Sequence, residues 1–213
     1  LIRQCTIDSA WDLDLGDVEQ QRLRDSACRS CASGVARSHV HSYEHEGALL
    51  AELFTHDGSG TLIAQNPYEQ ARSADINDIA SIVELIRPLE DSDALVRRSR
   101  ERLEEEISYF SILERDGRVL ACAALYPYEA ESVGEIACVA TPPDHRGTGR
   151  AQQLLEELIA EAKALSLTHV FVLTTQSTHW FLEQGFEAAS PDDLPVEKQQ
   201  LYNWQRNAVV LRR

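Results

Sequence analysis

The sequence contains no methionine, and no apolar run approaches the ~18 residues that a membrane-spanning helix needs. Basic residues are scarce: 20 Lys and Arg stand against 35 Asp and Glu, which gives a formal net charge of -15. Nucleic acids and anionic membranes attract basic surfaces, so this balance argues against both as partners. No signal peptide opens the chain at Leu1. We expect a cytoplasmic protein, and a chain that is a piece of a longer one.

The five cysteines are an odd and scattered set, which makes a poor disulfide framework. Cys28 and Cys31 form a CxxC motif within a helix-like run, without a second ligand pair, and are therefore expected to be packing residues rather than zinc ligands. His39, His41 and His45 have no carboxylate or cysteine partners at ligand spacing. The sequence predicts no metal site.

What the sequence does contain is a glycine loop between a strand-like run, residues 135–140, and a helix-like run, residues 154–159. The first turn of a helix carries unpaired N–H groups and partial positive charge, so it binds anions, and glycine permits the positive φ of such loops. The spacing fits neither a P-loop nor a dinucleotide fingerprint. A phosphate-binding loop and an ordinary strand-to-helix turn are the two interpretations of its residues, Arg146, Gly147, Thr148, Gly149, Arg150 and Ala151.

Periodicity divides the chain into two segments, residues 1–66 and 73–213, joined near residues 66–73. In the first, we expect helices over residues 18–31 and 47–55 and strands over residues 36–43 and 61–64, which is too little for a core of its own. In the second, we expect helices over residues 76–86, 99–107 and 178–184, with Pro88 ending the first of them, and another helix that follows the glycine loop and runs to about residue 165. Strands are expected over residues 109–114, 119–125, 133–140, 169–174 and 207–211, with a hairpin at Asp116-Gly117.

Arg146, Gly149 and Ala151 fill the fixed positions of an Arg/Gln-x-x-Gly-x-Gly/Ala motif, and with the order of elements around them this segment resembles the GNAT acetyltransferases. The resemblance implies the GNAT acyltransferase fold, an α/β (α+β) architecture with a mixed central sheet flanked by helices, over residues 73–213. It also implies acetyl-CoA as co-substrate, without a metal. The loop, with the backbone of Cys138 and Val139, would bind this donor.

Longer strings narrow the resemblance to the bacterial-type N-acetylglutamate synthase family. They are residues 95–101, 121–127, 134–140 and 173–181, while residues 38–40 and 47–61 resemble the end of the amino-acid kinase domain that precedes the acetyltransferase in that family. The resemblance implies acetyl transfer from acetyl-CoA to the amino group of L-glutamate, the first step of arginine biosynthesis, by direct attack without an acyl-enzyme. We expect a homo-oligomer in the intact protein.

Glutamate brings two carboxylates, which arginine binds in a planar, bidentate way. The candidates for this contact are Arg97 or Arg98, together with Arg206, as the resemblance also implies. The alternative for Arg97 and Arg98 is a position at a helix start without substrate contact, which we expect for one of the two. Glu135 is the candidate base for the substrate ammonium, with a surface position at a strand edge as the alternative. Thr174 resembles the position of a hydroxyl that protonates the leaving thiolate.

The sequence departs from the family at two positions. Phe181 stands where many GNAT members have a tyrosine acid, and Ala208 where some relatives carry a serine near the substrate. Cys138 lies in an apolar strand without a nearby histidine, so we expect a packing residue rather than an acylated nucleophile.

The first segment also suggests a regulatory site. Glu52, Gly58 and Gly60 resemble the site where L-arginine binds as a feedback inhibitor in the family, and a carboxylate suits a guanidinium. Two other functions stay open: a GNAT enzyme acting on another amine or a peptide N-terminus, and an arginine-sensing module without catalysis.

Overall fold

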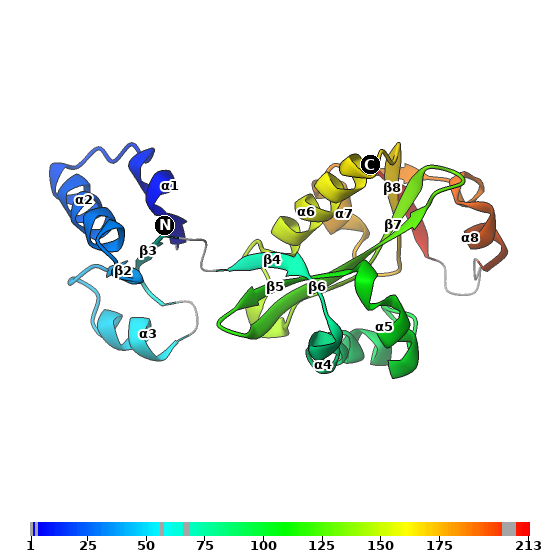
Figure 1. Ribbon diagram of the computed structural model, residues 1–213, viewed down its shortest axis with the longest axis horizontal. Coiled ribbons are helices and arrows are strands. Elements are labelled where there is room, and N and C mark those ends of the chain that lie inside the picture. The colour runs from blue at the N-terminus through cyan, green and yellow to red at the C-terminus, as the bar shows by residue number, and fades with distance from the viewer. Residues whose placement is uncertain (1, 3, 56–57, 66–68, 202–207) are drawn as a thin grey trace. The chain divides into compact units, whose positions relative to one another are not determined.

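The structure is a computed structural model, which describes residues 2, 4–55, 58–65, 69–201 and 208–213 (Figure 1). The chain forms two compact units, Leu1–Glu69 and Gln70–Arg213. Among the described residues, no helix is both long enough and apolar enough to cross a membrane.

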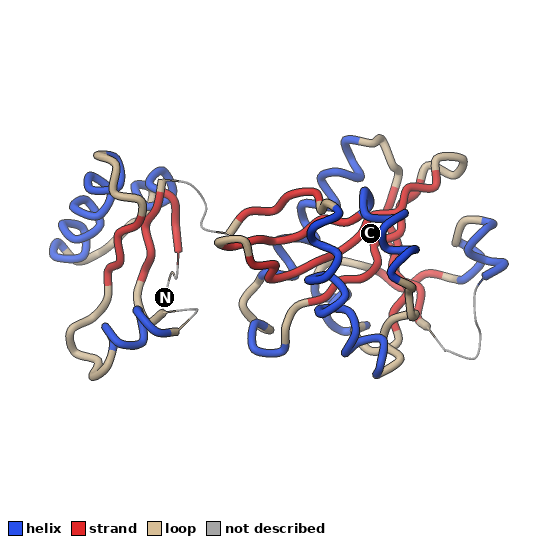
Figure 2. The backbone as a smooth tube through the Cα atoms, turned by 60° about the horizontal axis from the view of Figure 1, so that its bottom comes forward, coloured by secondary structure: helices blue, strands red, loops and turns tan. Residues whose placement is uncertain are grey.

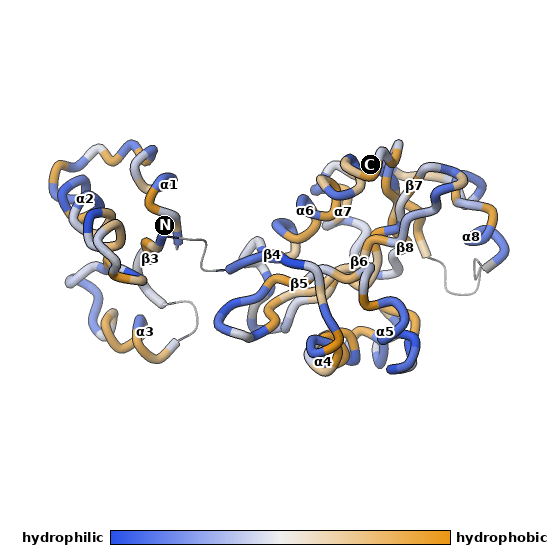
Figure 3. The backbone as a smooth tube through the Cα atoms, viewed as in Figure 1, coloured by the Kyte–Doolittle hydropathy of each residue, from blue (hydrophilic) through white to orange (hydrophobic). Residues whose placement is uncertain are grey.

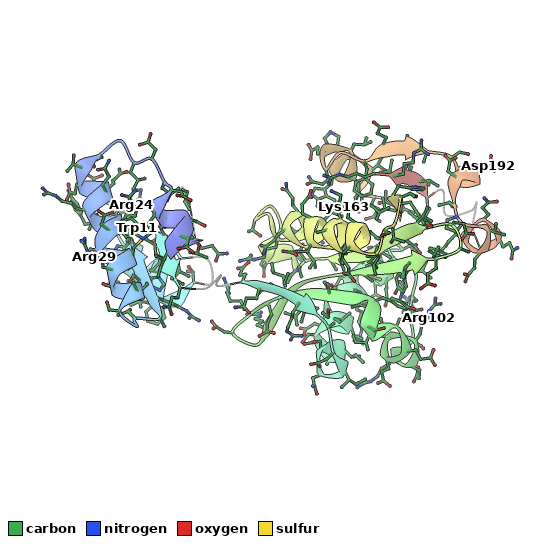
Figure 4. The ribbon with its side chains drawn as sticks, turned by 45° about the horizontal axis from the view of Figure 1, so that its top comes forward. Trp11, Arg24, Arg29, Arg102, Lys163 and Asp192 are labelled. Atoms are coloured by element: carbon green, nitrogen blue, oxygen red, sulfur yellow. The ribbon has the colours of Figure 1, made fainter. Side chains whose placement is uncertain are left out.

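In its described residues, the first unit is a small sheet with three helices. Its central strand β3 pairs in parallel with β1 and antiparallel with β2. Arg24 lies over the ring of Trp11, 5.5 Å from its centroid (Figure 4). Helix α3 is mostly apolar (Figure 3), and Leu49, Leu50 and Leu53 on it are exposed. The elements are β1 (Gln4–Thr6), α1 (Ile7–Trp11), α2 (Val18–Ala32), β2 (Arg37–Val40), α3 (Ala48–Phe54) and β3 (Thr61–Ala64).

A small apolar cluster holds this unit together, although the sequence analysis expected no separate core. It is built from helices α1 and α2 and strand β3. Both cysteines of the CxxC motif are buried free thiols in it, as expected for packing residues. The cluster consists of Ala10, Ala27, Cys28, Cys31 and Ile63. The assignment of residues 1–66 to an amino-acid kinase fold stays a prediction.

The second unit is built on a seven-stranded sheet in the order β4-β5-β6-β7-β8-β10-β9. Strands β7 and β8 are parallel, and all other neighbours are antiparallel, so the expected mixed sheet is confirmed. The strands are β4 (Gln70–Ser73), β5 (Phe110–Arg115), β6 (Arg118–Tyr128), β7 (Val133–Ala140), β8 (His169–Thr174), β9 (Glu187–Ala189) and β10 (Val209–Arg212). The helices are α4 (Ile79–Asp91), α5 (Arg100–Glu106), α6 (Arg150–Ala164), α7 (Thr178–Glu183) and α8 (Val196–Leu201), with short 3₁₀ turns at Ile76–Asp78, Ile107–Tyr109, Pro143–His145 and Pro191–Asp193.

Helices cover both faces of this sheet (Figure 2). Side chains alternate between the faces of a strand, and β6 shows this alternation clearly. Ala121 and Ala123 pack with Leu154 and Leu158 of α6, while Cys122 lies in a second cluster with residues of α4 and α5. Helix α6 and then the parallel strand β8 follow β7 along the chain. Because these elements share one apolar layer, the position of the glycine loop between β7 and α6 is fixed.

The hairpin between β5 and β6 has the bounds that the Asp116-Gly117 signal predicts. Asp116 has φ 50° and Gly117 has φ 76°. Two successive positive φ angles are typical of the turn that matches the twist of a two-residue hairpin. The predicted strands 133–140 and 169–174 are likewise confirmed as β7 and β8.

Two expectations about the elements were wrong, and two elements were not predicted. Helix α4 continues through Pro88 to Asp91. Proline has no N–H to donate and weakens the helix there. However, Leu89 packs against the core, and the Leu89 carbonyl accepts a hydrogen bond from Ala94 N–H. The expected joining segment ends in strand β4, which pairs with β5. Strand β9 and helix α8 were not predicted, because their short runs carry little periodicity.

Candidate active site

A cleft of about 1210 Å³ opens where β7 and β8 diverge. The two strands pair only from Val133–His169 to Glu135–Phe171, although both are described to their ends. The segment between α4 and α5, the glycine loop, α7 and α8 form the other walls. Twelve of the predicted site residues line this cleft: Arg97, Arg98, Glu135, Cys138, Val139, Arg146, Gly147, Thr148, Gly149, Arg150, Ala151 and Thr174.

The glycine loop adopts the backbone conformation that its residues predict. Gly147 has φ 73° and Gly149 has φ 84°, and a Cβ at either position would meet no protein atom within 4 Å. Glycine is therefore favoured here by backbone conformation and not by crowding. Gly149 is the N-cap of α6, whose first residue, Arg150, is buried and donates from Nη1 to Thr148 Oγ1 at 3.2 Å.

Glu135 lies at the point where β7 and β8 separate. It is 6% exposed, so the alternative of a surface glutamate is wrong. Its Oε2 accepts a hydrogen bond from the Tyr128 hydroxyl at 3.3 Å and forms an ion pair with Lys198 Nζ at 2.7 Å. Burial raises the pKa of Tyr128, which keeps that phenol a neutral donor. The carboxylate is thus oriented by two partners at the floor of the cleft.

Arg97 and Arg98 differ in burial. The Arg97 side chain is 75% exposed and pairs with Asp91 at 3.1 Å, whereas the Arg98 side chain is 12% exposed. Arg98 Nη1 donates to Val96 O at 3.1 Å. Its buried Nε forms an ion pair with Glu106 Oε2 at 3.8 Å but has no hydrogen-bond partner among the described residues. Burial lowers the pKa of Arg98, but nearby acidic groups raise it overall, so the guanidinium stays charged. A buried donor without an acceptor is costly, which favours a ligand oxygen at this position.

Two neighbouring threonines contribute hydroxyls at the end of β8. Thr174 Oγ1 accepts a hydrogen bond from Ser177 N–H at 2.9 Å, which holds the turn before α7. Thr175 Oγ1 also lines the cleft and is buried without a hydrogen-bond partner in the described part of the chain. Phe181 is buried and packs edge-on against Phe186, with the ring centroids 5.3 Å apart. The hydroxyl of Thr175 is therefore a second candidate in the cleft, and it was not predicted from the sequence.

Cys138 occupies a β-bulge in β7. The β6 residues Cys122 and Ala124 pair with Ala140 and Ala137, so β7 has one extra residue between these pairs, and Cys138 has φ 54°. Its side chain is buried, and burial raises the pKa of the thiol to about 11. A neutral, packed thiol agrees with the expectation that Cys138 is not an acylated nucleophile.

Glu52, Gly58 and Gly60 lie together in the first unit. Glu52 Oε2 accepts hydrogen bonds from Ser59 N–H at 2.6 Å and Gly60 N–H at 2.9 Å, and Oε1 contacts His39 Nδ1 at 2.5 Å. Burial raises the pKa of Glu52, but these hydrogen bonds lower it overall. A Cβ at Gly58 would collide with this carboxylate, and a Cβ at Gly60 with the backbone of β2. The loop is built around an ionised Glu52.

The remaining expectations concern Arg206 and metals. Arg206 lies outside the described residues, while Ala208 lines the cleft. Within the described ranges, no three His, Cys, Asp or Glu side chains converge in a way that suits a metal ion. Lys198, Tyr128 and Thr175 were not predicted. For Lys198 a signal was available, because the chain contains only one other lysine, Lys163.

The chain is similar in sequence and in fold to known proteins. The amino-acid acetyltransferase of Pseudomonas aeruginosa is 52% identical over 196 residues, which cover 92% of this chain and 45% of that protein. The enzyme of the same name from Serratia proteamaculans is 54% identical over 190 residues, covering 89% and 43%. The crystal structure of N-acetylglutamate synthase from Neisseria gonorrhoeae, complexed with coenzyme A and L-arginine, matches with a TM-score of 0.79 at 39% identity and covers all of this chain and 49% of that one.

The chain therefore spans about half the length of the relatives it matches. The expected likeness to bacterial-type N-acetylglutamate synthases is confirmed. The model of the "Acetyltransferase (GNAT) family" matches residues 76–186, which include the sheet from β5 to β8 and the glycine loop. With this match over half of its length, the chain belongs to the GNAT acetyltransferase family.

Proposed function

We propose that this chain transfers the acetyl group of acetyl-CoA to the α-amino group of L-glutamate, giving N-acetylglutamate and CoA. The observation that carries the proposal is that one cleft contains the glycine loop, the buried Glu135 and the buried Arg98. The names of the relatives, amino-acid acetyltransferase and N-acetylglutamate synthase, support the same reaction.

The donor half of the proposed site is the glycine loop with the adjoining part of β7. The N–H groups at the start of α6 and the helix dipole suit the pyrophosphate of acetyl-CoA, and Arg146 adds positive charge in an acidic chain. The bulge at Cys138 and the end of β7–β8 pairing expose the backbone of Cys138 and Val139 to the cleft. In the proposed site, N–H groups of this segment polarise the thioester carbonyl.

The acceptor half of the proposed site requires cations for two carboxylates. Arg98 is the better candidate of the adjacent pair, because it is buried and its Nε, 3.8 Å from Glu106 Oε2, has no hydrogen-bond partner among the described residues, while Arg97 pairs with Asp91 at the surface. A guanidinium can bind one carboxylate through two parallel hydrogen bonds. Arg206 stays a candidate for the other.

The proposed reaction assigns one proton transfer to Glu135. The α-ammonium gives a proton to this carboxylate, directly or through water, and the freed nitrogen attacks the thioester carbon. The C–N bond forms and the C–S bond breaks. The nitrogen gives its second proton to the leaving thiolate, directly or through water, while a hydroxyl of Thr174 or Thr175 stabilises that thiolate. No covalent acyl-enzyme is needed, in agreement with the neutral thiol of Cys138.

Thiol release from acetyl-CoA with a panel of acceptors tests this function. The panel comprises L-glutamate, L-glutamine, other amino acids, short peptides and simple amines. We expect L-glutamate to give the highest kcat/KM. A peptide or a simple amine as the best acceptor would contradict the proposal, and absence of turnover with every acceptor would favour a regulatory module instead.

We also propose that the loop around Glu52 binds L-arginine, since its carboxylate is ionised and buried beside exposed His39. Calorimetry should show that the chain prefers L-arginine to L-citrulline, which has the same shape without the charge. Glu52→Gln is expected to abolish this preference, a loss of about 10-fold or more in arginine affinity. Glu46→Gln, at an exposed position of the same unit, is the control. A preference that survives in Glu52→Gln would contradict the assignment.

A further inference from the structure

Lys198 forms the shortest contact that the structure gives Glu135. Its Nζ lies 2.7 Å from Glu135 Oε2, and the two side chains are 24% and 8% exposed. Lys198 belongs to α8, and both residues line the cleft. In the proposed reaction, the acceptor ammonium must approach a carboxylate that already has a cation beside it.

This arrangement discriminates between kinds of amine. A simple ammonium at Glu135 would lie close to the like charge of Lys198, and the two cations would share a single carboxylate in a partly buried site. An α-amino acid carries a carboxylate on the same carbon as its amino group. Its ammonium can face Glu135 while its carboxylate faces Lys198, so that opposite charges alternate along the contact.

We infer that Lys198 is a specificity-determining residue that binds the α-carboxylate of the acceptor and thereby selects α-amino acids over other amines. The inference rests on the proposed function, because it concerns the acceptor of that reaction. It leaves Arg98, on a different wall of the cleft, and the candidate Arg206 for the side-chain carboxylate.

A purely structural role for Lys198, as the tether of α8, has less support. Helix α8 has another attachment: Val196 N–H donates to Glu131 Oε1 at 3.3 Å. Gln199 Nε2 also holds the turn that precedes the helix, donating to Asp192 O at 2.9 Å and to Leu194 O at 2.8 Å. These contacts fix the helix start without the lysine. The ion pair with Glu135 is therefore available for a role in recognition.

The test compares acceptors in Lys198→Met. We expect kcat/KM for L-glutamate to fall by about 10- to 100-fold, the usual effect of losing a charge-assisted contact. With the α-amide of L-glutamate, which has no α-carboxylate, kcat/KM should stay the same or rise. The preference for L-glutamate over this amide should shrink accordingly, and Lys198→Arg should restore part of it.

Lys163→Met is the matched control, because Lys163 is exposed on α6 (Figure 4) and should leave the preference unchanged. An unchanged preference over the α-amide in Lys198→Met would overturn the inference. A loss confined to the preference over L-glutamine, which lacks the side-chain carboxylate, would also overturn it. If the unaltered chain turns over no acceptor, the proposed function fails, and calorimetric binding of L-glutamate and its α-amide to the same variants decides the role of Lys198 separately.

Discussion

Glu135→Gln is expected to lower kcat for L-glutamate acetylation by about 10²- to 10⁴-fold, the usual contribution of a general base. Glutamine keeps the shape of the side chain and the hydrogen bond from the Tyr128 hydroxyl, but it cannot accept the proton. Since the acceptor amine loses its proton in bulk water at high pH, the defect should become smaller as the pH rises. Steady-state thiol release over a pH series measures both effects.

Two controls separate the base from its surroundings. Glu157→Gln, at an exposed position on α6, should leave kcat unchanged. Glu135→Gln also removes the ion-pair partner of Lys198. The double variant Glu135→Gln, Lys198→Met tests whether the unpaired lysine charge causes the defect. Recovery of kcat in the double variant, or a normal kcat in the single one, would show that Glu135 is not the base.

Arg98→Met is expected to raise the KM for L-glutamate by about 10- to 100-fold, because a buried, charge-assisted contact to a carboxylate is lost. The KM for acetyl-CoA should change little, since the donor loop belongs to other residues of the cleft. Arg98→Lys should give an intermediate result, because lysine keeps the charge without the bidentate geometry. Initial rates over both substrate concentrations give the two constants.

The adjacent arginine supplies the control for this experiment. Arg97→Met removes a cation of the same size one residue away, but one that is 75% exposed and paired with Asp91. We expect it to leave both constants unchanged. A larger effect from Arg97 than from Arg98, or an equal rise in both KM values for Arg98→Met, would reject the assignment. Thermal unfolding of the variants shows whether loss of the Arg98–Val96 contact alters the fold.

Much of the second unit is predictable from its sequence because local signals and burial agree. Strands 133–140 and 169–174 are apolar runs with clear ends, and the hairpin at Asp116-Gly117 needs two positive φ angles that these residues tolerate. The predicted helix end at Pro88 was wrong, because packing of the following turn outweighs the local cost of proline in a helix. Strand β4 depends on its partner β5, which no local pattern reveals.

The donor loop was predictable for a related reason: its residues are contiguous, and the helix that follows fixes their geometry. The acceptor site depends on residues from separate elements, and a sequence carries no direct signal for such proximity. Neighbours such as Arg97 and Arg98 look alike in sequence, and only burial distinguishes them. Lys198 meets Glu135 through the placement of α8, a helix too short to be predicted.

The separation of β7 and β8 gives the sheet two edges in its interior. Beyond Glu135 and Phe171, the two strands no longer pair with each other, although each still pairs with its outer neighbour. Exposed strand edges usually attract other chains and lead to aggregation. Here the two edges face each other across a cleft. A slender, extended molecule with amide groups can hydrogen-bond to them, whereas a strand of another protein has no flat edge with which to pair.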